Sequence, residues 1–121
     1  MLNLDTHIFL HALAGSLTRR EEALLRREPW SISAIVLWEI AKLAQLGRIE
    51  VDLDDREVTR ALSRIQVWPL SLEVCRAIRG LDVTGDPADE IVAATSVAYK
   101  VPLVTRDRQL RRSKVIPFAR G

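Results

Sequence analysis

The amino-acid sequence predicts an α/β fold, a three-layer α/β/α sandwich around a central, mostly parallel sheet of four to five short strands. Short apolar segments alternate along the chain with longer segments of helical periodicity. Such alternation is typical of a parallel sheet covered by helices. Apolar residues make up 48% of the chain, enough for a buried core. The length of 121 residues suits a single domain, residues 1–121.

In the first half of the chain, the pattern predicts strands at residues 2–4 and 30–33 and helices at residues 6–14, 18–27 and 34–46. Gly15 and Gly47 mark two helix ends, because glycine readily adopts the left-handed conformation that closes a helix. Ser33 is placed to cap the helix that begins at residue 34.

In the second half, the pattern predicts helices at residues 55–65, 72–79 and 87–99, strands at 66–70, 102–105 and 115–118, and a helical turn at 108–112. Pro87 suits the first position of its helix, where a missing N–H needs no partner. Pro117 cannot donate to a sheet, so residues 115–118 are expected to form an edge strand.

Arginine dominates the basic residues. Fifteen arginines and three lysines contribute to a formal net charge of only +2. The guanidinium group matches phosphate oxygens and fits a nucleic-acid partner. A general arginine bias of the source genome explains the same composition, and composition alone favours this second interpretation.

The single cysteine, Cys75, excludes an internal disulfide bond and favours a reducing cytoplasm. It lies in a helical pattern, where we expect it to pack rather than react. The apolar runs are far shorter than the roughly 18 residues of a membrane span, and the N-terminal segment lacks the basic start of a signal peptide. We therefore expect a cytoplasmic protein with no membrane partner.

Two aspartates follow predicted strands. Asp5 ends the first strand, and Asp107 comes shortly after residues 102–105. Ligands of parallel sheets bind outside the carboxyl ends of the strands, so both positions suit a functional site. Each aspartate also precedes a helical segment, and taken alone each is better explained as a helix cap.

Three further acids stand at the start of helix 87–99. Asp86 precedes Pro87 and is expected mainly to cap the helix. Asp89 and Glu90 lie in the first turn, where the helix dipole favours negative charge. Glu90 is expected on a solvated face, whereas for Asp89 the local pattern supports a functional role and a stabilising role about equally.

Glu39 points most clearly to function. It lies in the middle of helix 34–46, and its helical neighbours include the apolar residues Ile35, Val36 and Leu43. A buried carboxylate without a partner costs several kcal/mol. Pairing with Lys42 is the alternative, but a lysine side chain extends more readily to solvent.

Four carboxylates are therefore candidates for one shared pocket: Asp5, Glu39, Asp89 and Asp107. Close like charges raise one another's pKa and strain the fold. A divalent cation removes this conflict, and all-oxygen ligands favour Mg²⁺ or Mn²⁺. Such a site predicts phosphodiester hydrolysis by a metal-activated water. We expect Thr6 and Thr105 to orient the carboxylates from a second layer of contacts.

Two histidines, His7 and His11, stand four residues apart, a spacing that zinc sites use. The segment "HIFLH" lacks the glutamate of the zinc-protease pattern. One histidine near the surface and one partly packed is the favoured interpretation.

The chain as a whole resembles a PIN domain, and most closely the VapC-like toxins of bacterial toxin–antitoxin pairs. The resemblance rests on "LNLDTHIFLHAL", "SISAIVLWEIAKLAQLGRIEV" and "GDPADEIVAATSVAYKVPLVTRD", and it covers essentially the whole sequence. Any one segment is a weak signal, but their combination in this order is specific.

This resemblance implies a nuclease that cuts RNA with Mg²⁺ or Mn²⁺ held by acidic residues. The matching positions are Asp5 after the first strand, Glu39 in "WEIAKL", Asp89 before "IVAAT" and Asp107 in "TRD". Asp86 is implied as an assisting residue. Glu90 is a departure, since many similar proteins carry arginine at this position.

The resemblance also implies a homodimer and a small antitoxin protein that crosses the toxin groove and places a basic side chain in the acidic pocket. Helices 18–27 and 34–46 are the candidate antitoxin surface, because Leu24 and Leu25 are expected to be exposed.

Two alternatives remain open. The first is a non-catalytic, PIN-like binding module whose acids only cap helices. The second, a phosphatase with Asp5 as nucleophile, is weaker, because such enzymes usually carry a second aspartate two residues later and this chain has His7 there.

Overall fold

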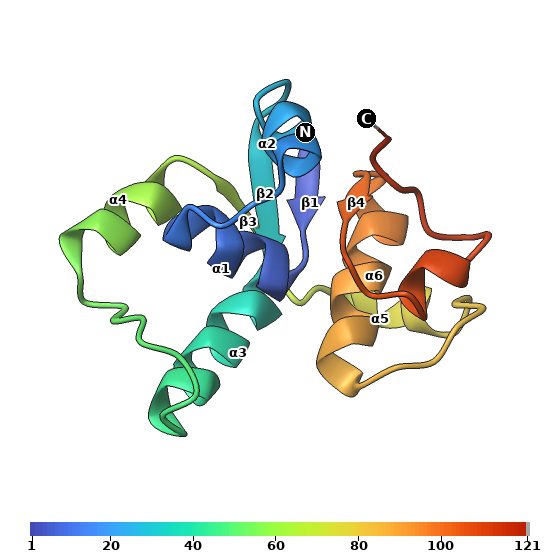
Figure 1. Cartoon of the computed structure of the whole chain (residues 1–121). Helices are drawn as coiled ribbons and strands as arrows, with labels where there is room; N and C mark the ends of the chain where they lie inside the picture. Colours follow the sequence, from blue (N-terminus) through green and yellow to red (C-terminus); the bar gives the residue numbers. More distant parts are fainter. Residues whose placement is uncertain (121) are drawn as a thin grey trace.

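The computed structural model describes residues 1–120 and confirms the predicted α/β fold (Figure 1). Within these residues the sheet has four parallel strands in the order β3-β2-β1-β4. The strands are β1 (Leu2–Leu4), β2 (Trp30–Ser33), β3 (Gln66–Trp68) and β4 (Leu103–Val104). Because all four run in the same direction, their carboxyl ends meet at one edge of the sheet.

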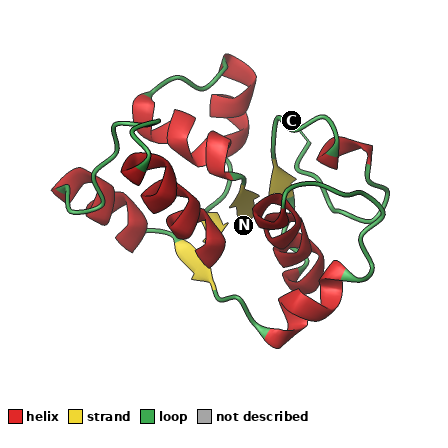
Figure 2. Ribbon diagram, turned by 90° about the horizontal axis from the view of Figure 1, so that it is seen from below, coloured by secondary structure: helices red, strands yellow, loops and turns green. Residues whose placement is uncertain are grey.

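Helices lie on both sides of the strands (Figure 2). They are α1 (Thr6–Ala14), α2 (Arg19–Leu25), α3 (Ala34–Gln45), α4 (Arg56–Ser63), α5 (Leu72–Ile78) and α6 (Pro87–Tyr99). A short 3-10 turn, η1 (Leu110–Arg112), follows β4. In Figure 1, α1 and α3 lie on one side of the molecule and α5 and α6 on the other. No helix within residues 1–120 has both the length and the apolar character needed to cross a membrane.

The helix bounds follow from the start and stop signals of the sequence. Asp5 Oδ1 accepts the Thr6 N–H at the start of α1 (2.9 Å). Ser33 Oγ accepts the Ile35 N–H at the start of α3 (3.3 Å). Gly15 ends α1 with a φ of 70°, a conformation that glycine adopts without steric strain.

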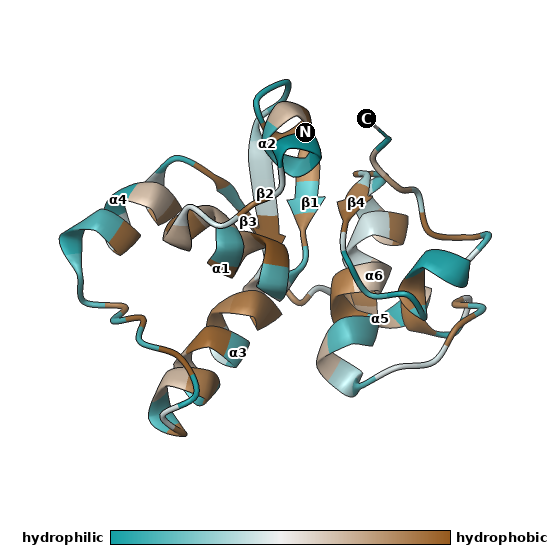
Figure 3. Cartoon of the chain, viewed as in Figure 1, coloured by the Kyte–Doolittle hydropathy of each residue, from teal (hydrophilic) through white to brown (hydrophobic). Residues whose placement is uncertain are grey.

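The core forms where the strands meet the helices. Leu2, Leu4 and Ile32 of the sheet are fully buried, and α3 contributes Val36 and Ile40. Figure 3 shows α3 as largely hydrophobic, whereas the turn η1 is hydrophilic. The buried apolar side chains supply most of the stability, at about 25 cal/mol per Å² of apolar surface removed from water.

A buried asparagine fixes the helix that carries Asp89. Asn3, in the middle of β1, is fully buried, and its Nδ2 donates to Val92 O (3.2 Å) and Ser96 Oγ (2.9 Å) of α6. These bonds set the position of α6 along the central strand. An unpaired polar group in the core costs free energy, so these bonds both stabilise the fold and favour one position of α6.

The predicted strand at residues 115–118 is wrong. This segment makes only one parallel bridge, between Leu103 and Phe118. Pro117 contributes its carbonyl oxygen, which accepts the Leu103 N–H (2.8 Å), but it has no N–H to continue a ladder. Within residues 1–120 the sheet therefore has four strands, the smaller of the two predicted numbers.

Three predicted side-chain environments are also corrected. Leu25 is 4% exposed and belongs to the core, and Leu24 packs against it, so residues 18–27 offer no exposed leucine surface. Cys75 is exposed, because α5 turns the neighbouring Val74 inward instead. Asp86 stands at the N-cap of α6 but makes no capping hydrogen bond, and Pro87 has no N–H to offer.

Candidate active site

Asp5 occupies the carboxyl end of the central strand β1. It is 3% exposed, and both of its oxygens are hydrogen-bonded. Oδ1 accepts the Thr6 N–H (2.9 Å), and Oδ2 accepts the hydroxyl of Thr105 (2.6 Å). The second bond depends on the sheet, because Leu4 pairs with Val104 and the next residues of the two strands then face each other. Asp5 is thus both a helix cap and a residue held in place by β4.

Thr105 links Asp5 to Asp107. Its hydroxyl donates to Asp5 Oδ2 and accepts the Asp107 N–H (3.0 Å). Asp107 in turn uses Oδ1 to accept the N–H groups of Gln109 (2.8 Å) and Leu110 (3.1 Å). One oxygen of Asp107 therefore caps the following turn, as the capping interpretation predicts.

The side chain of Glu39, in α3, contacts Thr6, the residue next to Asp5. The hydroxyl of Thr6 donates to Glu39 Oε1 (2.5 Å). Burial raises the pKa of Glu39, the Thr6 hydrogen bond opposes this change, and the nearby charge of Asp5 adds to it. Lys42 is not its partner, because Lys42 Nζ donates to Gln45 instead (2.9 Å).

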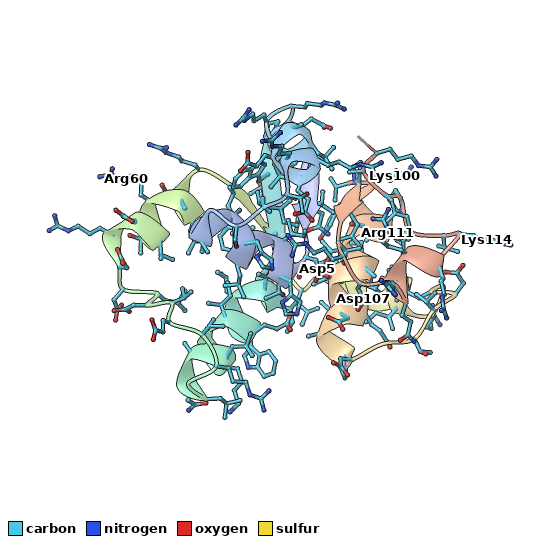
Figure 4. All side chains as sticks on the ribbon, viewed as in Figure 1. Asp5, Arg60, Lys100, Asp107, Arg111 and Lys114 are labelled. Carbon is cyan, nitrogen blue, oxygen red and sulfur yellow. The ribbon has the colours of Figure 1, made fainter. Side chains whose placement is uncertain are left out.

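These contacts form one continuous path of hydrogen bonds from Glu39 through Thr6, Asp5 and Thr105 to Asp107. We name this path, together with Asp89, the acidic site. Apart from the neighbouring Asp5 and Thr6, its members are far apart in the sequence. They come from the junction of β1 and α1, from α3, from the first turn of α6 and from the segment after β4. Figure 4 shows Asp5 and Asp107 close to each other near the centre of the molecule.

Asp89 completes the acidic site from the first turn of α6. Its pKa is raised to about 6, first by burial and then by the charges of Asp5, Glu39, Asp107 and Asp86. The carboxylates of four separate elements therefore act on one another electrostatically.

The remaining residues at the edge of the acidic site are less deeply placed. Asp86 is exposed and adds to the negative field on Glu39 and Asp89. Glu90 is partly exposed beside it. His7 is exposed, and its charge lowers the pKa of Glu39 slightly against the dominant effect of burial. The structure thus adds His7 to the surroundings of Glu39.

Within residues 1–120, no ion pair links a basic side chain to the acidic site. The ion pairs within residues 1–120 join Met1 to Glu28, Arg26 to Glu22 and Arg106 to Glu21, all at other places. In the same part of the chain, no three Asp, Glu, His or Cys side chains stand close enough together to hold a metal ion as they are. The carboxylates share an electrostatic field rather than a closed cage of ligands.

The donor set nevertheless fits a divalent cation. It consists of carboxylate oxygens, which are the ligands that Mg²⁺ and Mn²⁺ prefer. The raised pKa values of Glu39 and Asp89 show that negative charge is unfavourable at this place. A cation here offsets that charge, and Thr6 and Thr105 already orient two of the carboxylates.

His11 belongs to a different network, which sequence patterns did not reveal. Its Nδ1 contacts Ser16 Oγ (2.7 Å), and its Nε2 contacts Nη1 of Arg106 (2.9 Å). Arg106 also donates through Nε and Nη2 to both oxygens of Glu21 (2.7 and 2.6 Å). Glu21 and Arg106 are separated by most of the chain, so no local spacing could have paired them.

Comparison with known proteins places this chain in a family. Residues 3–115 match the PIN domain family. The chain belongs to the PIN domain family. PIN domains are generally nucleases. No functionally curated protein is significantly similar in sequence.

The fold of this PIN domain is also that of several solved structures. One is VapBC2 from Rickettsia felis bound to a DNA fragment from its promoter, with a TM-score of 0.71 at 20% identity, covering 98% of this chain and 97% of that one. A toxin–antitoxin complex from Klebsiella pneumoniae gives a TM-score of 0.67 at 20% identity, covering 90% and 89%. FitAcB from Neisseria gonorrhoeae gives 0.65 at 22% identity, covering 98% and 96%. At these identities the likeness establishes the fold.

Proposed function

We propose that this PIN domain is a metal-dependent endoribonuclease, the toxin of a toxin–antitoxin pair, which hydrolyses RNA phosphodiester bonds. The observation that carries the proposal is the path of hydrogen bonds that joins Glu39, Asp5 and Asp107, close enough to Asp89 for their charges to raise its pKa. If these acids had only a structural role, they would not need to lie together, and the half-buried Glu39 would not need to lack an ion-pair partner within residues 1–120.

In this proposal Asp5, Glu39, Asp89 and Asp107 hold Mg²⁺ or Mn²⁺. The cation, when bound, lowers the pKa of a water and stabilises charge on the leaving oxygen. The hydroxyl of Thr105 donates to Asp5 Oδ2 and that of Thr6 to Glu39 Oε1, so each threonine orients one carboxylate. Asp89 has a pKa of about 6, and a bound cation would favour its charged form.

The toxin role and the partners rest on the similar structures. The Rickettsia and Klebsiella structures are described as VapBC2 and as a toxin–antitoxin complex. We extend that assembly to this chain as an antitoxin protein that covers the acidic site, and we propose a homodimer as the toxin's assembly. RNA as the substrate and the cytoplasm as the location belong to the same proposal.

A non-catalytic binding module is the second candidate, and one observation favours it. Asp5 and Asp107 both cap the segments that follow them. In that case Asp5→Asn lowers stability by about 1 kcal/mol, as the loss of a cap does. In a metal site the same change relieves repulsion and raises the melting temperature of the metal-free protein.

RNA cleavage by the purified protein with Mg²⁺ or Mn²⁺ tests the proposal. Glu39→Gln keeps the shape of the side chain but removes its charge, and we expect cleavage to fall by about 100-fold, the scale of losing one preorganised charged group. Glu57→Gln on the exposed face of α4 is the matched control and should cut as the parent does. A Glu39→Gln variant with full activity would show that the site is not the nuclease centre.

A further inference from the structure

A second, oppositely charged site lies directly beside the acidic site. It is a cavity of about 850 Å³ between α2, the end of β4, the turn η1 and the C-terminal segment. Five arginines line it: Arg20, Arg106, Arg108, Arg111 and Arg120. Glu21 is the only acid among the lining residues of the described chain. We name this cavity the arginine cavity.

One arginine of the cavity is already neutralised. Arg106 makes two hydrogen bonds to the carboxylate of Glu21, and this pairing lowers the pKa of Glu21 to about 2. The pair ties α2 to the end of β4 and so forms the wall of the cavity. Four arginines then face the cavity with no carboxylate within ion-pair distance in residues 1–120.

Arg111 is fixed in place by neutral groups. Its Nη1 donates to the carbonyl oxygen of Thr105 (3.1 Å), and its guanidinium lies 5.8 Å from the centre of the Phe118 ring. Its positive charge therefore remains available, and its orientation is set before any ligand binds. Figure 4 shows Arg111 on the same side of the molecule as Asp107, whereas Arg60 lies at the opposite edge.

Thr105 connects the two sites. It lines the arginine cavity, and its hydroxyl donates to Asp5 in the acidic site. When one phosphate of a nucleic-acid strand lies in the cavity, the neighbouring phosphate of the strand therefore lies beside the acidic site. The arginine fork matches phosphate oxygens, and Phe118 adds an aromatic surface to the same cavity.

We propose that the arginine cavity is a phosphate subsite that holds the single-stranded RNA backbone next to the bond to be cut. The inference rests on the proposed nuclease function, because it assigns the neighbouring substrate units to this cavity. In this arrangement Arg20, Arg108 and Arg111 bind backbone phosphates, and the acidic site receives the adjoining linkage.

RNA binding without cleavage tests the subsite. We would measure fluorescence anisotropy of a labelled single-stranded RNA of mixed sequence in EDTA, for the parent and for the double variant Arg20→Gln/Arg108→Gln. Both residues are exposed, so the variant should fold. We expect binding about tenfold weaker and a salt dependence with a slope smaller by about 1.4, since each phosphate contact on a single strand contributes about 0.7. Arg56→Gln/Arg60→Gln on α4 removes the same charge and should bind as the parent does.

Cleavage with Mn²⁺ separates this inference from the proposed function. The subsite predicts that Arg20→Gln/Arg108→Gln raises KM about tenfold with little change in kcat, as loss of remote binding does. If the parent cuts RNA and this variant binds and cuts equally well, the subsite is wrong and the nuclease stands. If the parent binds RNA through these arginines but does not cut, the nuclease is wrong and the subsite stands.

An acidic protein segment is the competing occupant. Hexaglutamate, added in the same anisotropy experiment, should displace the RNA only weakly, because it has no bases to contact the Phe118 ring of the cavity. Displacement by hexaglutamate at lower concentration than by unlabelled RNA overturns the RNA assignment.

Discussion

The acidic site and the arginine cavity both include residues at the end of β4, but they differ in whether a basic side chain neutralises their carboxylates. In the cavity, Glu21 pairs with Arg106 and has a pKa of about 2. In the acidic site, Asp89 has no basic partner and a pKa of about 6. The pKa of Asp89 is raised by burial and by nearby acids, whereas the pKa of Glu21 is lowered by its bond to Arg106. Repulsion between carboxylates therefore remains in the acidic site, whereas Arg106 neutralises the carboxylate of the arginine cavity. This difference is expected if only the acidic site binds a cation.

Thr105→Val breaks the link between the two regions and should have the largest effect. The change removes the hydroxyl that joins Asp5 to Asp107 but keeps a similar shape. We expect RNA cleavage to fall by about 10- to 100-fold, the usual effect of losing a contact that orients a metal ligand.

Thr59→Val is the matched control, because its hydroxyl only contacts the Arg56 carbonyl on the exposed α4. Cleavage rates for both variants with Mn²⁺ check the prediction. Equal activity of the two variants would mean that the position of Asp5 does not depend on Thr105.

The pH dependence of stability sharpens the contrast between Asp89 and Glu21. Asp89 has a folded pKa of about 6, above the ordinary 3.8, so the folded state binds more protons than the unfolded state between these values. Its contribution therefore makes the metal-free protein less stable as pH rises from about 4 to about 6. Thermal melts in EDTA should show this loss, and Asp89→Asn should reduce it, leaving the smaller loss that the raised pKa of Glu39 contributes.

Glu21 behaves in the opposite direction. Its folded pKa of about 2 lies below the ordinary 4.5, so its stabilising contribution is present above pH 4.5 and is lost as pH falls toward 2. Melts of Glu21→Gln should lack this acid-side loss. If the two variants change the same part of the pH profile, the assigned environments of Asp89 and Glu21 are wrong.

Glu21→Gln also alters the charge of the arginine cavity. It frees the Arg106 guanidinium and leaves the cavity without an acid. We expect RNA in EDTA to bind about threefold more tightly, because one further positive charge faces the backbone. Anisotropy at two salt concentrations measures this change, and Glu57→Gln serves as the control. Weaker binding would show that the pair holds the cavity in shape rather than limiting its charge.

Asp86→Ala should have the smallest effect on stability. Asp86 makes no capping hydrogen bond, so its replacement should change the free energy of unfolding by less than about 0.5 kcal/mol. Asp55→Ala is the comparison, because Asp55 does cap α4 through the Glu57 N–H (2.9 Å) and its loss should cost about 1 kcal/mol. Urea unfolding of both variants would distinguish them, and equal losses would restore Asp86 as a cap.

The sequence by itself determined the elements that local signals specify. The helix from Thr6 to Ala14 and the helix from Pro87 to Tyr99 have the predicted bounds, because Asp5, Gly15 and Pro87 act on their own neighbours. The four candidate ligands were also visible, since Glu39 interrupts an apolar helix face and two aspartates follow strands. These signals depend on residues a few positions apart.

Only the tertiary structure decided how distant side chains meet. The bonds from Thr105 to Asp5 and from Thr6 to Glu39 require the strand order and the packing of α1 on α3. The pairing of Glu21 with Arg106 arises in the same way. Periodicity records which face of an element is buried but not which other element covers it. For that reason the acids and the orienting role of Thr6 and Thr105 could be predicted from the sequence, whereas the carboxylate that each threonine contacts and the arginine cavity could not.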